Sequence, residues 1–157
     1  MPQINAMWSG LVRNLSNRFF EGIALLLART ALGLIFFRSY QTKVTDEGWF
    51  AIDQTQYLLF ANEFTGLPLS PEIAVPLTTY SEFLFPILLF AGLASRISAS
   101  ALAVMALVIQ AFVFPSLDHF FGWAITVFAL AAIVISRGAG VFSIDALLAR
   151  GWTMRAR

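Results

Sequence analysis

Two charged residues, Arg29 and Glu82, stand inside stretches of sequence that are otherwise apolar enough to enter a membrane. A charged side chain at the middle of a bilayer costs about 2.5 to 3.5 kcal/mol on a translocon-type scale, so each charge needs a partner. Arg29 lies midway along its apolar run, and Glu82 lies at a similar depth in the next run, counted from the opposite end. We therefore predict an ion pair between Arg29 and Glu82 across two antiparallel helices.

Such a pair supports two interpretations. It is either purely architectural, satisfying both charges and fixing the register of two helices without guaranteeing net stability, or it is the centre of a polar cavity. The cavity would include Thr78 and Thr79, one turn from Glu82, together with Gln110 of the third apolar run. Hydroxyl and amide groups beside paired charges could bind the carbonyl headgroup of a quinone or relay a proton.

His119 and Trp123 lie one turn apart at the start of the fourth apolar run. Tryptophan is enriched at membrane interfaces, so the two residues are typical of an aromatic belt, while His119 could instead protonate a substrate that enters from outside. With one histidine and no cysteine, the chain alone cannot build a multi-histidine metal or haem site, an iron–sulfur cluster or a disulfide. We expect no metal site and no covalently bound cofactor, and any redox group must come from elsewhere.

The elements that must position these residues are membrane helices. Of the 157 residues, 59% are hydrophobic and only 12% are charged, whereas a soluble domain carries about 25% charged residues. The net charge of +1 and the lack of a basic tract give no support to nucleic-acid binding. Four runs are long enough to cross about 30 Å of hydrocarbon, and they span about 20–38, 72–94, 97–114 and 120–136.

We predict an all-α fold in which residues 1–157 form a single membrane domain, a four-transmembrane-helix bundle. Residues 1–18 have the apolar spacing of an interfacial amphipathic helix, serving as a membrane anchor or as a docking helix for a partner, and 141–150 predict a second one. The outer loop, 39–71, is too apolar for a free loop and rests on the membrane surface or roofs the bundle. The N-terminus lacks the order of a signal peptide, so we expect it to be kept.

Lysine and arginine counts in the short loops predict the orientation. With the N-terminus inside, the outer side holds Lys43, with Arg38 at its rim. The inner side then holds seven arginines: Arg13, Arg18, Arg96, Arg137, Arg150, Arg155 and Arg157. We expect both termini to be cytoplasmic.

Several short motifs, taken in order, resemble the DoxX family of small integral membrane proteins over nearly residues 20–150. They are the arginine-containing first run followed by FFRSYQTK (36–43), then FANEF (60–64), LPLSPEIA (67–74), Glu82 with Pro86, GLASR (92–96) and SIDALLAR (143–150). Tyr40 stands where related sequences commonly have a glycine, which argues against a role that needs close backbone approach there. The resemblance implies a multi-pass subunit of the bacterial inner membrane that works beside redox proteins, such as a thiosulfate:quinone oxidoreductase or a terminal quinol oxidase.

The leading hypothesis is a quinone-interacting subunit of a membrane redox system, which carries out no redox chemistry by itself. Its expected partners are the lipid bilayer and other membrane or redox subunits. The alternative is a non-enzymatic accessory or scaffold subunit of a membrane complex. A small transporter or proton path is a third hypothesis, although four short spans leave little room for alternating access.

Overall fold

The computed structural model describes residues 17–46 and 48–155, and that part of the chain is mainly helical. Among the described residues the only extended pairing is an isolated antiparallel bridge between Val44 and Ile52, so the predicted all-α class is confirmed. The helices are α2 (Arg18–Gln41), α3 (Thr55–Asn62), α4 (Pro71–Ala91), α5 (Ser95–Val108), the π-helical turn η1 (Ile109–Val113), α6 (Leu117–His119), a second π-helical turn η2 (Phe120–Ala124), α7 (Ile125–Arg137) and α8 (Ile144–Arg155).

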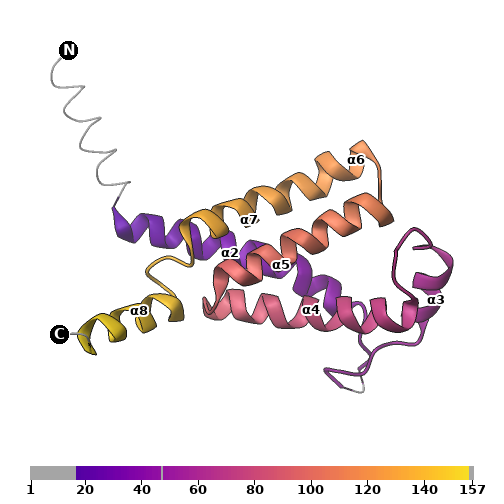
Figure 1. Cartoon of the computed structure of the whole chain (residues 1–157), viewed down its shortest axis with the longest axis horizontal. Coiled ribbons are helices and arrows are strands. Elements are labelled where there is room, and N and C mark those ends of the chain that lie inside the picture. The colour runs from indigo at the N-terminus through magenta and orange to yellow at the C-terminus, as the bar shows by residue number, and fades with distance from the viewer. Residues whose placement is uncertain (1–16, 47, 156–157) are drawn as a thin grey trace, which may run out of the picture.

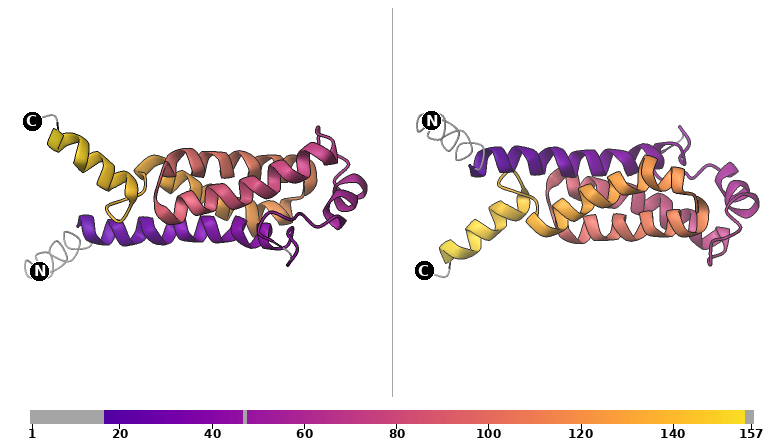
Figure 2. Two further views of the ribbon diagram at one scale, coloured as in Figure 1. Left: turned by 90° about the horizontal axis from the view of Figure 1, so that it is seen from below. Right: turned by 90° about the horizontal axis from the view of Figure 1, so that it is seen from above.

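Four long helices pack side by side into an antiparallel bundle (Figures 1 and 2). α2 contacts both α4 and α7, and α5 contacts the same two helices. In the described part of the chain, four helical stretches are long and apolar enough to cross a membrane, which confirms the predicted number of spans: Arg18–Gln41, Pro71–Ala91, Ser95–Val113 and Leu117–Arg137. We call the end of the bundle where α2 begins and α8 lies the terminal end, and the end covered by α3 the loop end.

The core lies between the four helices and contains mainly small and aliphatic side chains. Small residues let helix backbones approach closely, and this matters in lipid because burying apolar surface between helices brings no hydrophobic gain there. Gly33 of α2 shows how close the approach is, since an added Cβ would lie 2.6 Å from the ring of Phe90 on α4. The buried members of the core are Ala28, Leu32, Phe36, Leu89, Ala99, Leu102, Ala106, Val127, Ala131 and Val134.

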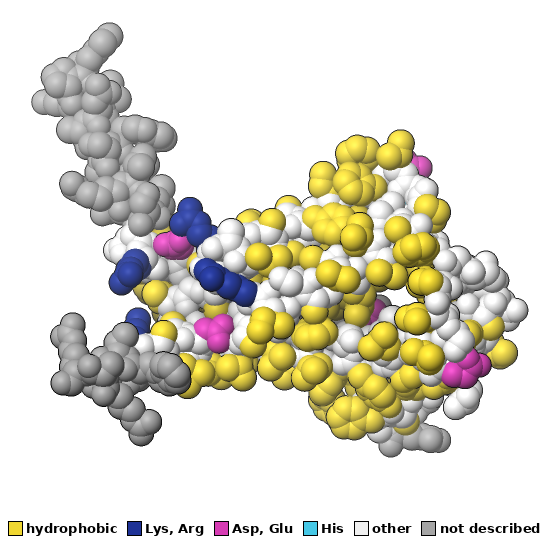
Figure 3. All heavy atoms as spheres, in the orientation of Figure 1, with side chains coloured by type: hydrophobic (Ala, Val, Ile, Leu, Met, Phe, Trp, Pro, Cys, Tyr) yellow, Lys and Arg dark blue, Asp and Glu magenta, His cyan; other side chains and the backbone are white. Residues whose placement is uncertain are grey.

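The surface of the bundle is apolar along its sides and charged at its ends. Figure 3 shows hydrophobic side chains covering the length of the bundle, while arginine side chains gather at the terminal end. Large apolar residues such as Leu27, Ile97 and Phe121 are 64%, 70% and 65% exposed. A bilayer accepts this surface and water does not, so the chain is a multi-pass membrane protein.

The link between α4 and α5 differs from the predicted boundary. α4 ends at Ala91, three residues before the end of the predicted 72–94 span, because Gly92 adopts a left-handed conformation (φ +66°) that closes the helix. α5 begins at Ser95 because the Asp145 carboxylate, from α8, accepts the N–H groups of Ala94 and Ser95 at 2.9 and 3.1 Å. This cap comes from a residue 50 positions away, so the local sequence could not reveal it.

The predicted outer loop packs against the bundle. α3 lies on the part of α4 that extends beyond the end of α2 (Figure 1). Phe60 of α3 joins Ala74 and Val75 of α4 in a second buried cluster. Of the two interpretations of this loop, the one in which it covers the bundle is therefore favoured.

Of the two predicted terminal amphipathic helices, only the C-terminal one lies largely within the described residues. The helix predicted over 1–18 lies outside the described residues except for its last two positions. α8 begins at Ile144, three residues later than predicted, and continues to Arg155. Its placement in the membrane interface stays a prediction.

Candidate functional site

Arg29 and Glu82 do not meet, so the predicted ion pair between them is wrong. The packing of Gly33 against Phe90 sets the register of α2 and α4. In this register Arg29 lies beside Gly92, whereas Glu82 lies ten residues before Gly92 along α4, or roughly 15 Å along the bundle at 1.5 Å per residue. The prediction aligned the middles of the two helices, but α4 extends well past the end of α2 toward the loop end.

Arg29 instead holds the link between α7 and α8. Its side chain is 2% exposed; Nη1 donates to the carbonyl oxygen of Ala139 at 3.3 Å and Nη2 donates to that of Phe142. Buried carbonyl groups need donors, and here a guanidinium from α2 supplies them. Gly92 borders the same guanidinium so closely that any Cβ at this position would overlap it. The partners of the buried arginine are therefore backbone carbonyl groups in place of Glu82.

Asp145 is the carboxylate near Arg29, close enough to interact with it electrostatically. Besides capping α5, its own N–H donates to the carbonyl oxygen of Gly92 at 2.9 Å. The hydroxyl of Ser143 accepts the N–H of Ala146 at 3.1 Å and so caps the start of α8. The only signal for Asp145 in the sequence is a serine two residues before an acid at the start of a predicted helix, and this signal does not indicate a contact with Arg29 or α5.

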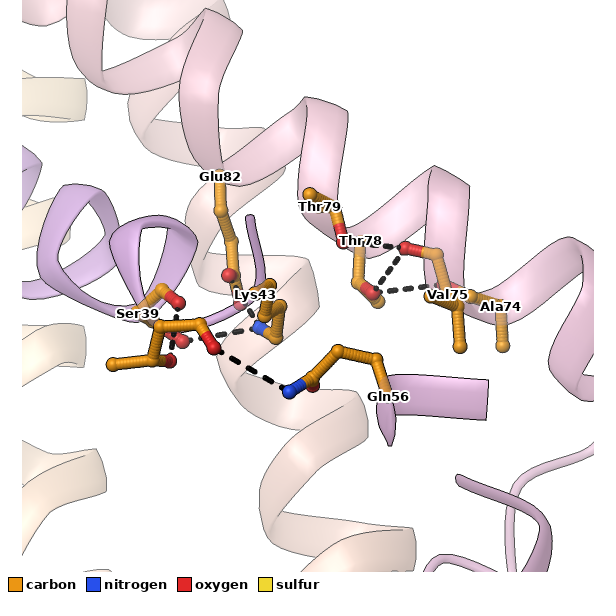
Figure 4. A network of polar contacts seen from close by, with 9 residues as sticks. Ser39, Lys43, Gln56, Ala74, Val75, Thr78, Thr79 and Glu82 are labelled. Carbon is orange, nitrogen blue, oxygen red and sulfur yellow. Dashed lines mark hydrogen bonds and ion pairs between the residues drawn. The ribbon is translucent and has the colours of Figure 1, made fainter. Parts of the chain in front are cut away.

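Glu82 forms its ion pair with Lys43, the single lysine of the chain (Figure 4). Lys43 lies just beyond the end of α2, and its Nζ donates to Oε2 of Glu82 and to Oγ of Ser39, the latter at 3.1 Å. The side chains of Lys43 and Glu82 are 12% and 2% exposed. From the sequence, Lys43 is predicted only as a charge of the outer loop, because a helix end predicted from hydropathy does not show which way the next residues fold.

Thr78 and Thr79 lie near this pair but do not contact it. Each hydroxyl donates to a carbonyl oxygen of its own helix: Thr79 to Val75 at 2.7 Å, and Thr78 to Ala74 at 2.8 Å (Figure 4). Their donors are therefore engaged within α4, and only their oxygen lone pairs remain for a ligand.

Gln110, His119 and Trp123 form a separate cluster at the loop end. Nδ1 of His119 lies 2.7 Å from Oε1 of Gln110, and the rings of His119 and Trp123 are 5.1 Å apart. The amide nitrogen of Gln110 donates to the carbonyl oxygen of Ser116 at 3.0 Å, which turns the amide oxygen toward the imidazole. A neutral His119 therefore carries its proton on Nδ1 and presents Nε2 as an acceptor.

The helices around this cluster are wound in an unusual way. Gln110 lies in the π-helical turn η1, and Trp123 lies in the second π-helical turn, η2. Single π turns inside α-helices occur frequently at functional sites. Trp123 also connects the cluster to α2, because its ring lies 5.9 Å from that of Phe36. The structure thus gathers six predicted site residues at the loop end in two groups, and leaves Arg29 toward the terminal end.

One of three comparisons with known proteins found a match. The DoxX family model matches residues 24–115, a segment that runs from α2 through η1 and contains Arg29, Lys43, Glu82 and Gln110. No curated protein and no solved structure matches the chain. Because the family match covers more than half of the 157 residues and the chain has four membrane-spanning helices, this multi-pass membrane protein belongs to the DoxX family.

Proposed function

We propose that this chain is a membrane subunit that binds the carbonyl headgroup of a quinone beside the Lys43–Glu82 pair. The pair itself is the observation that supports the proposal. Ionisable residues at membrane depth are expensive and are functional by default, and this pair joins a helix interior to a residue in the loop that follows α2. Arg29 is no longer part of the proposed site, since its two Nη groups donate to the α7–α8 link.

The donors around the pair suit a carbonyl oxygen. The ammonium group of Lys43 has three N–H donors, of which two go to Glu82 and Ser39 in the described part of the chain. The third can donate to a quinone oxygen, and Glu82 beside it can hold or release a proton at the same oxygen. A bound quinone would supply the redox chemistry, with electrons coming from a partner protein.

A cavity lined by residues on both sides of Lys43 in the chain, three of them aromatic, provides space for a ring. It has a volume of about 280 Å³, close to the lower end of the range for ligand pockets. It is lined by Phe37, Tyr40, Gln41, Val44, Thr45, Asp46, Gly48 and Trp49. Aromatic walls favour stacking on a quinone ring. Lys43 does not line the cavity, so the proposal requires the loop that follows Lys43 to open when the headgroup reaches the ammonium.

The test replaces both charges with neutral residues of similar size, Lys43→Met and Glu82→Gln, in one protein. The matched control, Arg38→Gln with Glu72→Gln, removes one exposed charge of each sign from α2 and α4. Each protein is purified gently from membranes, and the quinone extracted per mole of protein is measured by mass spectrometry. Wild type and control should carry quinone, and the Lys43/Glu82 variant should lose it. Equal quinone in all three proteins would contradict the proposal.

A second function, an accessory or scaffold subunit without a ligand, is favoured by one observation. Arg29 and Asp145 tie α8 to the bundle, and α8 projects from the terminal end where a partner can reach it (Figure 2). The same purification distinguishes the two functions. A wild-type protein that carries stoichiometric partner subunits and no quinone would support the scaffold.

A further inference from the structure

A wide cleft of about 840 Å³ opens at the terminal end, between the start of α2, the end of α7 and α8. Arginine is the prevailing charged residue of its lining. Four arginines line the cleft, Arg18, Arg96, Arg137 and Arg150, against two acids, Glu21 and Asp145. Figure 3 shows basic side chains gathered at this end of the molecule. The cleft therefore carries a surplus of positive charge.

The two acids are already engaged with groups of the protein. Glu21 Oε1 accepts a hydrogen bond from Arg137 at 3.1 Å, and Asp145 accepts two backbone N–H groups at the start of α5. Arg96 donates through Nη2 to the carbonyl oxygen of Ser136 at 3.3 Å, and a guanidinium has five N–H donors in all. The cleft thus keeps planar donors of the kind that bind phosphate in a bidentate manner.

The arginines stand at the depth of lipid headgroups. Arg18 is the first residue of the span Arg18–Gln41, and Arg137 is the last residue of the span Leu117–Arg137. Arg96 is the second residue of a third span, which begins at Ser95. The ends of spans of this length lie at the boundary between hydrocarbon and headgroups, and basic pockets between membrane helices bind anionic headgroups there.

An apolar groove continues from the cleft along α5. It has a volume of about 410 Å³ and is lined by Ile97, Ser100, Ala101 and Val104, with Arg96 shared between groove and cleft. The groove runs from the end of the span toward the middle of the bilayer. A free phosphate ion would make no use of such a groove, whereas an acyl chain would lie in it, so the combination favours a lipid.

We propose that the cleft binds the phosphate of an anionic phospholipid, with one acyl chain of the same lipid in the groove beside Arg96. Arg18 and Arg96 donate to the phosphate oxygens, and Ile97 and Val104 contact the chain. This site is at the opposite end of the bundle from the Lys43–Glu82 pair. It does not depend on the quinone proposal.

The test measures lipid binding by native mass spectrometry of the full-length protein in detergent. The probes are phosphatidylglycerol and phosphatidylcholine with the same acyl chains, each also titrated in the presence of inorganic phosphate. The variants are Arg18→Gln, Arg96→Gln and the two combined, and the matched control is Arg38→Gln, which removes one exposed arginine near the loop end. Far-UV circular dichroism and thermal melting establish that each variant is folded.

The wild type should bind phosphatidylglycerol more tightly than phosphatidylcholine. Each cleft substitution should weaken this preference about fivefold, and the double variant roughly ten- to thirtyfold, while Arg38→Gln leaves it unchanged. Ala101→Phe, which fills the groove without changing charge, should weaken the binding of long-chain phosphatidylglycerol more than the binding of a short-chain form. Equal binding of the two lipids by the wild type, an unchanged preference in the folded double variant, or full displacement of the lipid by inorganic phosphate would overturn the proposal.

Discussion

Removing one charge of the Lys43–Glu82 pair should destabilise the protein far more than removing both. Glu82→Gln leaves an ammonium group that is 12% exposed without its counter-charge, and Lys43→Met leaves a carboxylate that is 2% exposed. Breaking a buried ion pair from one side costs about 3–5 kcal/mol, whereas replacing both partners is often neutral or stabilising. The double variant should therefore be at least about 3 kcal/mol more stable than the sum of the two single effects predicts.

The assay is reversible unfolding in mixed micelles by increasing the fraction of denaturing detergent, followed by tryptophan fluorescence and circular dichroism. The same cycle on Glu21 and Arg137, whose side chains are 44% and 69% exposed and whose closest atoms are 3.1 Å apart, provides the matched control. An exposed pair should show a coupling of only about 0.2–1 kcal/mol.

The result that would refute this reasoning is additivity at the buried pair. If the Lys43/Glu82 double variant is as unstable as the two single variants together, the two charges act independently. The short contact between Lys43 and Glu82 would then carry no energetic meaning, and the quinone proposal would lose the observation that supports it.

Two further predictions concern a glycine and a carboxylate. Gly92→Ala places a side chain at φ +66° against the Arg29 guanidinium, so it should lower the free energy of unfolding by roughly 3 kcal/mol or more in the same assay. The control Gly48→Ala, whose added Cβ meets no atom within 4 Å, should change the free energy of unfolding by less than about 0.5 kcal/mol. Equal effects of the two substitutions would contradict the packing described. Asp53 accepts the N–H of Thr55 at 2.9 Å, which holds its pKa below the usual 3.8. The ionised Asp53 carboxylate contributes fully to stability when the pH is above the usual pKa of the group. This contribution is lost as the pH falls through the lower pKa of the folded state. A carboxyl NMR titration checks this, and a midpoint at or above 3.8 would be the contrary result.

The cluster around His119 illustrates how far a sequence pattern reaches. One-turn spacing correctly placed His119 beside Trp123, because residues four apart share a helix face. It did not reveal that Gln110 on the preceding helix would orient the imidazole, or that π-helical turns would carry Gln110 and Trp123. Those features depend on how two helices meet at the loop end, and no local pattern encodes that meeting.

The sequence by itself determined the class of protein and the number of spans. In lipid every backbone polar group must be satisfied inside the chain, so each long apolar run has to form a helix, and the composition left no soluble alternative. The ordered motifs likewise indicated the DoxX family, which the family match confirms.

Only the tertiary structure decided which charges meet. The hydropathy of a run establishes that it crosses the membrane, but it does not determine how far one helix is shifted along another. The packing of Gly33 on Phe90 and the extension of α4 beyond α2 determine that shift. They bring Glu82 to Lys43 and Arg29 to the carbonyl groups of the α7–α8 link. The arginine cleft depends on the same kind of long-range placement, since it exists only where α8 returns to the ends of three separate spans.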